Sequence, residues 1–202
     1  MRLIRPLGVA AATLALILSV TACHNSGPPS QNSPQISFAD RTPFRLNVAE
    51  VEVVWEYQPP GHLPNVDQQM ALPPGSAIVR WVQDRLRPVG QAGSGSARVV
   101  IRDASVVEVP LRVDRSLSGS FKNEQEMRYD GTLQIAIEIK DARRITVADV
   151  TAAAQRSRSV AEDLTLNQRD RILFDISEDL ARDIDRQMDQ LIRDYFGRWL
   201  VR

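Results

Sequence analysis

The apolar residues near the C-terminus recur at steps of three and four positions. The residues at these positions are Leu173, Ile176, Leu180, Ile184, Met188, Leu191 and Tyr195. This spacing is typical of one face of an α-helix and predicts a helix of about 30 residues. Thr165 and Gln168 have the spacing of a capping box, and Asn167 is a second candidate N-cap. We expect the apolar stripe to pack on a β-sheet, with pairing to a helix of another chain as the alternative.

The remaining positions of this predicted helix are mostly charged. They include Arg171, Asp175, Glu178, Asp179, Arg182, Asp183, Asp185 and Arg186. A solvated helix face explains this pattern without any binding site.

Four segments alternate apolar and polar residues with a period of two, which predicts β-strands. They are residues 44–57, 97–113, 127–140 and 145–160. In the first segment the apolar residues change parity near Val48, and in the last they change parity between Val147 and Val150. A bulge or bend is therefore expected at both places. Residues 141–144, between the third and fourth segments, have the composition of a hairpin turn.

A second helix is predicted over residues 76–88. Its apolar residues recur at three- and four-residue steps and are Ile78, Trp81, Val82, Leu86 and Val89. Ser76 is the expected N-cap, and Pro88 with Gly90 is expected to end the helix.

Two segments rich in glycine or proline flank this helix. Residues 58–75 contain five prolines and two glycines, which predicts a long loop without a regular element. Residues 90–96 lack the Lys-Ser or Lys-Thr pair of a phosphate loop, so we expect a turn there.

Together these elements predict an α+β domain over residues 44–202. Their order is β-α-β-β-β-α, with one mixed or antiparallel sheet of about four strands and both helices packed on one face. At roughly 160 residues the domain is large enough for one hydrophobic core.

The N-terminus has the pattern of a bacterial export signal. Arg2 and Arg5 precede an apolar run over residues 7–20. This run is shorter than the ~20 residues that a membrane-spanning helix needs. The sequence Val-Thr-Ala-Cys that ends at Cys23 resembles the lipobox of bacterial lipoproteins. We therefore expect residues 1–22 to be a signal peptide and the Cys23 thiol to carry diacylglycerol.

Cys23 is the only cysteine of the chain, and lipidation accounts for an exported thiol without a disulfide partner. Residues 23–43 are rich in Ser, Asn, Gln and Pro, which predicts a disordered tether. The residue after Cys23 is His24 rather than an acidic residue, which favours sorting to the outer membrane. We expect the acyl chains to hold a periplasm-facing domain there.

The charge balance and the two histidines exclude several function classes. Removal of residues 1–22 takes away two arginines and no acidic residue, which leaves 23 basic and 25 acidic side chains. Nucleic acid is not an expected partner, because binding it needs a clear excess of basic residues. His24 lies beside the anchor and His62 lies in the proline-rich loop, so neither fits a zinc site or a catalytic triad. We expect no catalytic residue, metal, cofactor or enzymatic activity.

The order of the elements behind Cys23 is similar to that of small outer-membrane lipoproteins that assist envelope transport. The most similar stretch is the fourth strand, which ends in Arg156-Ser157 and passes through Glu162-Asp163 into the long helix. Over residues 44–196 the chain resembles the lipoprotein family that plugs the lipopolysaccharide translocon, and also auxiliary lipoproteins of lipid-transporting ABC systems. The resemblance implies a non-enzymatic accessory module in envelope biogenesis or lipid transport. Its implied partners are envelope proteins and lipopolysaccharide or phospholipid.

One departure from the translocon family concerns the tether. In that family the domain begins almost at the lipidated cysteine, with a glycine and an aromatic residue close behind. Here a tether of about 20 residues intervenes, which suits a module that reaches a periplasmic partner better than one seated in a pore. A structural lipoprotein that joins the membrane to peptidoglycan is the main alternative function, and a hydrolase is the third.

Four arginines, two at one end of the third and fourth strands and two further along, are candidates for binding an anionic lipid. They are Arg143, Arg144, Arg156 and Arg158. Guanidinium groups match phosphate oxygens, and such charge-assisted hydrogen bonds are roughly twice as strong as neutral ones. The alternative is a solvated hairpin turn in which Asp141 partly neutralises the arginines.

Replacement of the anchoring cysteine tests the lipoprotein assignment. We expect Cys23→Ser to block processing, because no thiol remains to accept diacylglycerol before signal cleavage. Metabolic labelling with palmitate should mark the mature wild-type chain and leave the variant unlabelled. An unlabelled mature wild-type chain would contradict the assignment.

Overall fold

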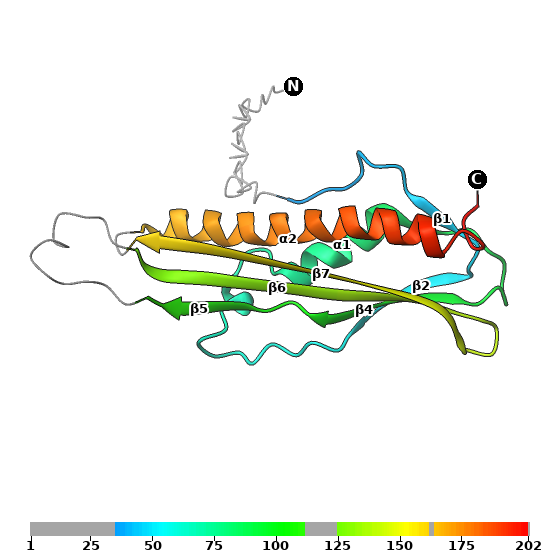
Figure 1. Ribbon diagram of the computed structural model, residues 1–202, viewed down its shortest axis with the longest axis horizontal. Helices are drawn as coiled ribbons and strands as arrows, with labels where there is room; N and C mark the ends of the chain where they lie inside the picture. The colour runs from blue at the N-terminus through cyan, green and yellow to red at the C-terminus, as the bar shows by residue number, and fades with distance from the viewer. Residues whose placement is uncertain (1–34, 112–124, 162–163, 202) are drawn as a thin grey trace, which may run out of the picture. The chain divides into compact units, whose positions relative to one another are not determined.

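The computed structural model describes residues 35–111, 125–161 and 164–201. The predicted signal peptide, Cys23 and the rest of the chain up to residue 34 lie outside the described residues. Figure 1 shows the arrangement of the elements. They are β1 (Phe44–Leu46), β2 (Glu50–Trp55), the 3-10 helix η1 (Asp67–Gln69), α1 (Pro74–Arg85), β3 (Leu86–Pro88), β4 (Ser96–Asp103), β5 (Val106–Pro110), β6 (Gln125–Lys140), β7 (Thr146–Ala161) and α2 (Leu166–Tyr195).

The main sheet has five strands arranged around β6. β7 pairs with β6 in antiparallel fashion along its whole length. On the other edge of β6, β4 pairs with residues 134–140 and β5 pairs with residues 127–131, both antiparallel. β2 runs parallel to β4. The α+β class is confirmed, but the sheet has one strand more than expected because the predicted strand over residues 97–113 is divided into β4 and β5.

A change of parity divides that predicted strand. Ile101 is buried at an odd position, whereas Ala104 and Val106 are buried at even positions. The pairing with β6 shifts between Ile101 and Asp103, so the chain cannot continue as one alternating strand.

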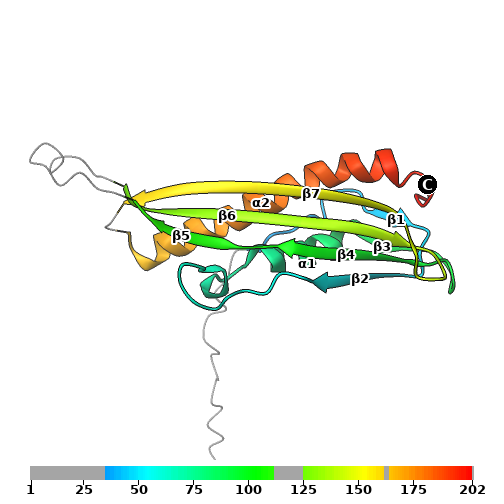
Figure 2. The same ribbon diagram turned by 60° about the horizontal axis from the view of Figure 1, so that its bottom comes forward.

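Both helices cover one face of the sheet, as expected (Figures 1 and 2). α2 packs mainly over β7 and β6, while α1 contacts α2 and β4. The sheet residues buried on this side are Ala97, Val99, Ile101, Leu133, Ile135, Ile137, Ile139, Val150, Ala152 and Ala154. The opposite face carries cross-strand ion pairs, in which Arg98 lies 3.8 Å from Glu52 and 3.5 Å from Glu138. Such a polar face of an antiparallel sheet can remain in water.

The sequence prediction for α2 is largely confirmed. Thr165 and Gln168 form the expected capping box at the start of a 30-residue helix. The predicted stripe is buried from Leu173 to Met188, but the prediction for Tyr195 is wrong, because its side chain is 64% exposed. Ile192 and Phe196 continue the buried stripe in its place. No helix in the described part of the chain is long and apolar enough to cross a membrane.

Close packing of α2 on the sheet depends on Gly131 of β6. A Cβ atom at this position would lie 2.7 Å from Cγ2 of Ile176 and 3.0 Å from Cδ1 of Leu180. Glycine therefore lets the helix approach the strand backbone where a larger residue would push it away.

α1 begins and ends earlier than predicted. Its N-cap is Pro73 and its first residue is Pro74, so the prediction of Ser76 as N-cap is wrong. Proline suits the first helical position because its φ is already helical and its missing N–H would have no partner there. The helix ends at Arg85, because the next three residues extend as β3 alongside β1.

The irregularity expected near Val48 is a complete break between two strands. β1 pairs with β3 in a separate two-stranded parallel sheet, and β2 then joins the main sheet beside β4. The second expected irregularity is confirmed as a bulge. Lys140 pairs with Thr146 and Ile139 pairs with Ala148, which leaves Val147 as the extra residue of β7.

The proline-rich loop between β2 and α1 is more ordered than predicted. It contains η1, and Val66, Asp67 and Met70 are buried. The Val66 N–H donates to the carbonyl of Val106, so the loop runs alongside β5. The expectation of a loop without a regular element is therefore wrong.

Residues 35–43, which the sequence assigned to the disordered tether, pack against the helices. Ile36 and Phe38 are buried. The Phe38 N–H donates to the carboxylate of Asp84 in α1 at 2.8 Å. The packed part of the chain therefore begins upstream of Phe44, because this segment carries two apolar residues that the helices can bury.

A buried ion cluster joins this segment to both helices. The side chain of Arg85 is 1% exposed, and its Nε donates to Asp185 of α2 at 2.8 Å. Another guanidinium nitrogen lies 2.6 Å from Asp189, and the third donates to the carbonyl of Thr42. Trp81 Nε1 also donates to Asp185 at 2.8 Å. The pKa of Asp189 is lowered, chiefly by its hydrogen bond from Arg193.

This cluster corrects the assignment of all charged α2 residues to a solvated face. Asp185 is 3% exposed and Asp183 is 8% exposed. Each carboxylate has an arginine partner, Arg85 for Asp185 and Arg156 for Asp183, which is what makes its burial tolerable.

Substitution in the α2 stripe tests the packing of helix on sheet. Leu180 is fully buried, so we expect Leu180→Asp to place an unpaired charge in the core and to unfold the domain. The matched control is Leu166→Asp, because Leu166 is 79% exposed and an acidic residue suits the first turn of a helix. Thermal unfolding followed by circular dichroism measures both. Equal unfolding midpoints for the two variants would show that the stripe is not core.

Candidate functional site

The turn between β6 and β7 is the hairpin predicted at residues 141–144. The carboxylate of Asp141 accepts hydrogen bonds from the backbone N–H groups of Arg143 and Ile145, both at 2.9 Å. The backbone N–H of Arg144 donates to the carbonyl of Asp141 at 2.9 Å. Asp141 thus stabilises the turn and leaves the arginine side chains pointing outward into solvent.

Arg143 and Arg144 are exposed. Within residues 35–111, 125–161 and 164–201, neither guanidinium group makes a hydrogen bond or an ion pair. Most other arginines of this part of the chain pair with a carboxylate. The turn therefore presents two positive charges that the described residues do not neutralise.

The structure does not bring the four predicted arginines together. Arg156 lies further along β7 and pairs with Asp183 of α2, and Arg158 lies 3.3 Å from Asp179. These two arginines face the helix side and are neutralised there. The sequence could not show this, because both carboxylates come from a distant helix.

Arg144 has a backbone conformation that favours glycine. Its φ is +64°, and in the described residues no other non-glycine residue has a positive φ. The left-handed region costs a residue with a Cβ atom about 1–2 kcal/mol relative to the right-handed one. The turn therefore holds Arg144 in a conformation that glycine would adopt at lower cost.

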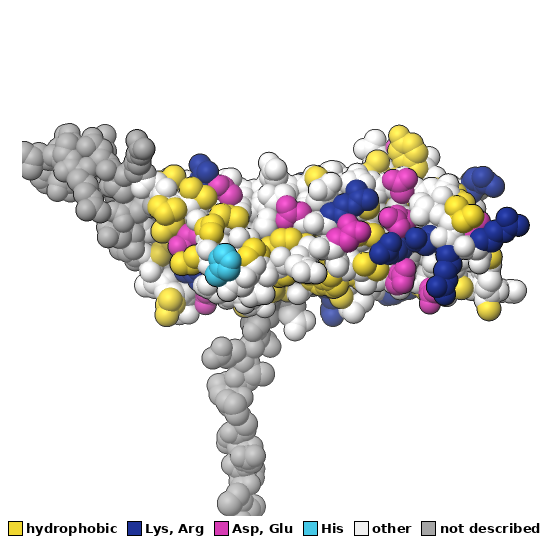
Figure 3. All heavy atoms as spheres, turned by 90° about the horizontal axis from the view of Figure 1, so that it is seen from below, with side chains coloured by type: hydrophobic (Ala, Val, Ile, Leu, Met, Phe, Trp, Pro, Cys, Tyr) yellow, Lys and Arg dark blue, Asp and Glu magenta, His cyan; other side chains and the backbone are white. Residues whose placement is uncertain are grey.

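A shallow groove lies beside Arg144 on the sheet face opposite the helices. It has a volume of about 330 Å³ and is lined by Glu50, Glu52, Val54, Ser96, Arg98, Lys140 and Arg144. Two of the three cations that line the groove have carboxylate partners, because Lys140 lies 3.6 Å from Glu138 and Arg98 pairs with glutamates. The third cation, Arg144, has no carboxylate partner among the described residues. Figure 3 shows Lys and Arg side chains gathered toward this end of the face, with Asp and Glu among them.

Two apolar side chains follow the arginines directly. Ile145 is 57% exposed and Val147 is 48% exposed. Val147 is the bulged residue of β7, which explains why its side chain leaves the alternation that buries Val150. The turn thus combines unpaired guanidinium groups with exposed branched aliphatic groups.

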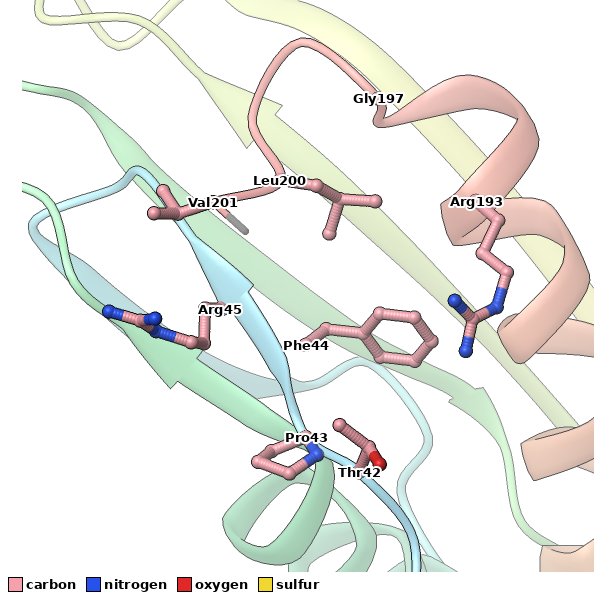
Figure 4. A pocket seen from close by; sticks show the side chains of 8 residues that line it. All are labelled: Thr42, Pro43, Phe44, Arg45, Arg193, Gly197, Leu200 and Val201. Atoms are coloured by element: carbon pink, nitrogen blue, oxygen red, sulfur yellow. The ribbon is translucent and has the colours of Figure 1, made fainter.

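A second cavity lies between β1 and the end of α2 (Figure 4). It has a volume of about 400 Å³ and is lined by Thr42, Pro43, Phe44, Arg45, Arg193, Gly197, Leu200 and Val201. Arg193 points toward the ring of Phe44, with 5.2 Å between guanidinium and ring centre, whereas Arg45 points away from it. Arg193 is held by Asp189 at 2.8 Å, so this cavity offers an anion less charge than the hairpin turn.

Side chains that could bind a metal ion or act in catalysis are few among the described residues. Among the described residues, no three His, Cys, Asp or Glu side chains are grouped so that they could hold a metal ion. His62 is exposed, and its Nδ1 lies 2.7 Å from the carbonyl oxygen of Leu63. Burial, followed by the nearby carboxylate of Asp67, raises the pKa of Tyr57 to about 12. Tyr57 therefore stays protonated and serves to hold the loop between β2 and α1.

Comparison with known proteins gives only remote likenesses. No model of a protein family matches the sequence, and no curated protein matches it. The rare lipoprotein B of Shewanella oneidensis has a TM-score of 0.40 at 10% identity, over 72% of this chain and 95% of that one. An uncharacterized lipoprotein B of Nitrosomonas europaea has a TM-score of 0.36 at 19% identity, over 71% and 84%. A minor lipoprotein of Acinetobacter baumannii has a TM-score of 0.35 at 14% identity, over 69% and 91%. Likenesses with such low TM-scores support no functional argument, so the function is argued from the residues of this chain.

The conformation of Arg144 leads to a stability prediction. We expect Arg144→Gly to raise the free energy of unfolding by about 0.5–1 kcal/mol, since the relief of backbone strain exceeds the entropy that glycine adds to the unfolded chain. Arg143→Gly is the matched control, because φ of Arg143 is not positive, and it should lower stability slightly. Denaturant unfolding measures both. A loss of stability in Arg144→Gly equal to that of the control would show that no strain is stored in the turn.

Proposed function

We propose that this chain is a lipid-anchored periplasmic lipoprotein of the outer membrane. In this proposal it acts as a non-enzymatic accessory module in envelope biogenesis or lipid transport. The anchor is the thiol of Cys23, and the ligand-contacting element is the turn between β6 and β7. The observation that carries the lipid-binding part is that the guanidinium groups of Arg143 and Arg144 have no partner among the described residues, and that Arg144 has a positive φ.

The chemistry of the turn favours a phosphate-bearing ligand. A guanidinium group offers several N–H donors in a plane that matches two phosphate oxygens. An anion that meets Arg143 and Arg144 displaces no carboxylate of the described residues. At Arg156 or Arg158 it would have to displace the carboxylate of Asp183 or Asp179. The proposal therefore narrows the predicted site to the first two arginines.

The proposed ligand is an anionic lipid, either lipopolysaccharide or a phospholipid. These share phosphate groups next to acyl chains, and the turn places cations next to Ile145 and Val147. An arginine near an anionic lipid surface contributes about 1 kcal/mol, so two contribute roughly 30-fold in affinity. That effect is large enough to measure and is weakened by salt.

The anchor keeps such a module close to its ligand. About twelve residues separate Cys23 from Gln35, the first described residue. A chain of that length spans at most about 40 Å even when fully extended. The domain would therefore stay at the membrane surface, where lipid in transit is accessible.

A double substitution tests the proposed ligand. We expect Arg143→Ala with Arg144→Ala to weaken binding to lipopolysaccharide or to dispersed phosphatidylglycerol about 30-fold while the fold is kept. The matched control is Arg102→Ala with Arg171→Ala, which removes the same charge from two surface ion pairs. Binding is measured by fluorescence titration at low and high salt. Comparing the two lipids distinguishes the sources of the phosphate.

Equal binding by the double variant and the control pair would reject the lipid-binding part of the proposal. Retained binding that does not respond to salt would reject it as well, because guanidinium recognition of phosphate must be screened by ions.

A further inference from the structure

Several connections of the chain meet at the end of the sheet that carries the β6–β7 turn. Figures 1 and 2 both place this turn, β1 and the C-terminus at one end. The turn between β3 and β4 lies against the hairpin, since a Cβ atom on Gly95 would meet the carbonyl oxygen of Lys140. Val89 and Val201 flank β1, donating their N–H groups to the carbonyls of Leu46 and Arg45. We call this region the hairpin end.

Exposed apolar side chains concentrate at the hairpin end. In the described part of the chain, the large apolar residues with high exposure are Trp55, Leu63, Val89, Ile145, Val147, Leu166, Tyr195 and Val201. Val89, Ile145, Val147 and Val201 belong to the hairpin end, and Val89 and Val201 line one hollow there. Single exposed aliphatic residues are ordinary on a protein surface, so these four support an interaction surface only together with the arginines beside them.

Two arginines at this end lie next to apolar residues. Arg143 and Arg144 precede Ile145 and Val147 in the same turn, and both guanidinium groups lack partners among the described residues. A protein partner would favour a closed apolar patch with charge excluded from its centre. Separate aliphatic side chains interspersed with long cationic ones fit the headgroup region of a bilayer instead, where aliphatic groups sink and guanidinium groups remain at the phosphates.

We propose that the hairpin end seats in the surface of an anionic lipid bilayer. Ile145 and Val147 enter the boundary between headgroups and acyl chains, while Arg143 and Arg144 bind lipid phosphates. The inference rests on the proposed role of these arginines and adds that the turn enters an assembled bilayer surface, which binding of single lipid molecules does not require. It makes the hairpin end a second membrane contact, distinct from the acyl anchor at Cys23.

A second contact would have a geometric effect that a single anchoring point does not have. The acyl anchor by itself would limit the distance of the domain from the membrane without setting its direction. Seating of the hairpin end would hold β6 and β7 at a steep angle to the membrane surface. The opposite end of the sheet, where β5 lies, would then face away from the membrane.

The experiment uses the full chain with its anchor, reconstituted in vesicles of phosphatidylglycerol with brominated acyl chains. We expect the fluorescence added by Ile145→Trp to be quenched strongly, at least twofold more than that added by Leu166→Trp. Leu166 is the control because it is 79% exposed and lies at the start of α2, away from the hairpin end. Vesicles of brominated phosphatidylcholine should quench the Ile145→Trp signal less.

The arms of this experiment separate the two proposals. Loss of dispersed-lipid binding in the double arginine variant, together with unquenched Ile145→Trp, would leave the arginine site standing and overturn bilayer seating. Quenching of Ile145→Trp that persists in Arg143→Ala with Arg144→Ala would overturn the role of the arginines in seating. Equal quenching of Ile145→Trp and Leu166→Trp would show that the anchor alone brings the domain to the bilayer.

Discussion

The arrangement of the helices and the segment before β1 depends on the buried guanidinium group of Arg85. Its Nε and terminal nitrogens donate to Asp185, to Asp189 and to the carbonyl of Thr42. At 1% exposure the charge has lost its hydration, so every donor needs a partner from the protein. One residue thereby fixes α1, α2 and residues 35–43 relative to one another. Loss of one partner from such a buried pair typically costs about 3–5 kcal/mol, because the other charge stays buried.

Arg85 also organises the end of the sheet that carries the hairpin turn. It closes α1, and the residues after it extend as β3 beside β1. The ring of Phe44 in β1 lies 4.7 Å from the guanidinium of Arg85 and 5.2 Å from that of Arg193. The C-terminal residues pair with the other side of β1, with Val201 donating to the carbonyl of Arg45. The surroundings of the turn are thus held by ordered elements.

The parts of the fold that follow from local periodicity were predictable, and those that depend on long-range pairing were not. α2, β6 and the hairpin turn were predicted because an amphipathic element carries the pattern of its own burial. Asp185 was assigned to solvent because an acidic residue looks the same whether it faces water or Arg85, which lies 100 residues away. The same reason explains why Arg156 was grouped with Arg144. Only the folded chain shows that Asp183 neutralises Arg156, whereas no described residue neutralises Arg144.

The bulge at Val147 makes the turn independent of the sheet that carries it. Below the bulge, Ile139 faces Ala148, and the pairing of β6 with β7 keeps one register until a second shift between Gln125 and Met127. On the turn side of the bulge, the register differs by one residue. The burial of one face of β7 therefore does not constrain which residues form the loop, or how many. The sequence and length of the hairpin tip are therefore free to vary while the core stays the same.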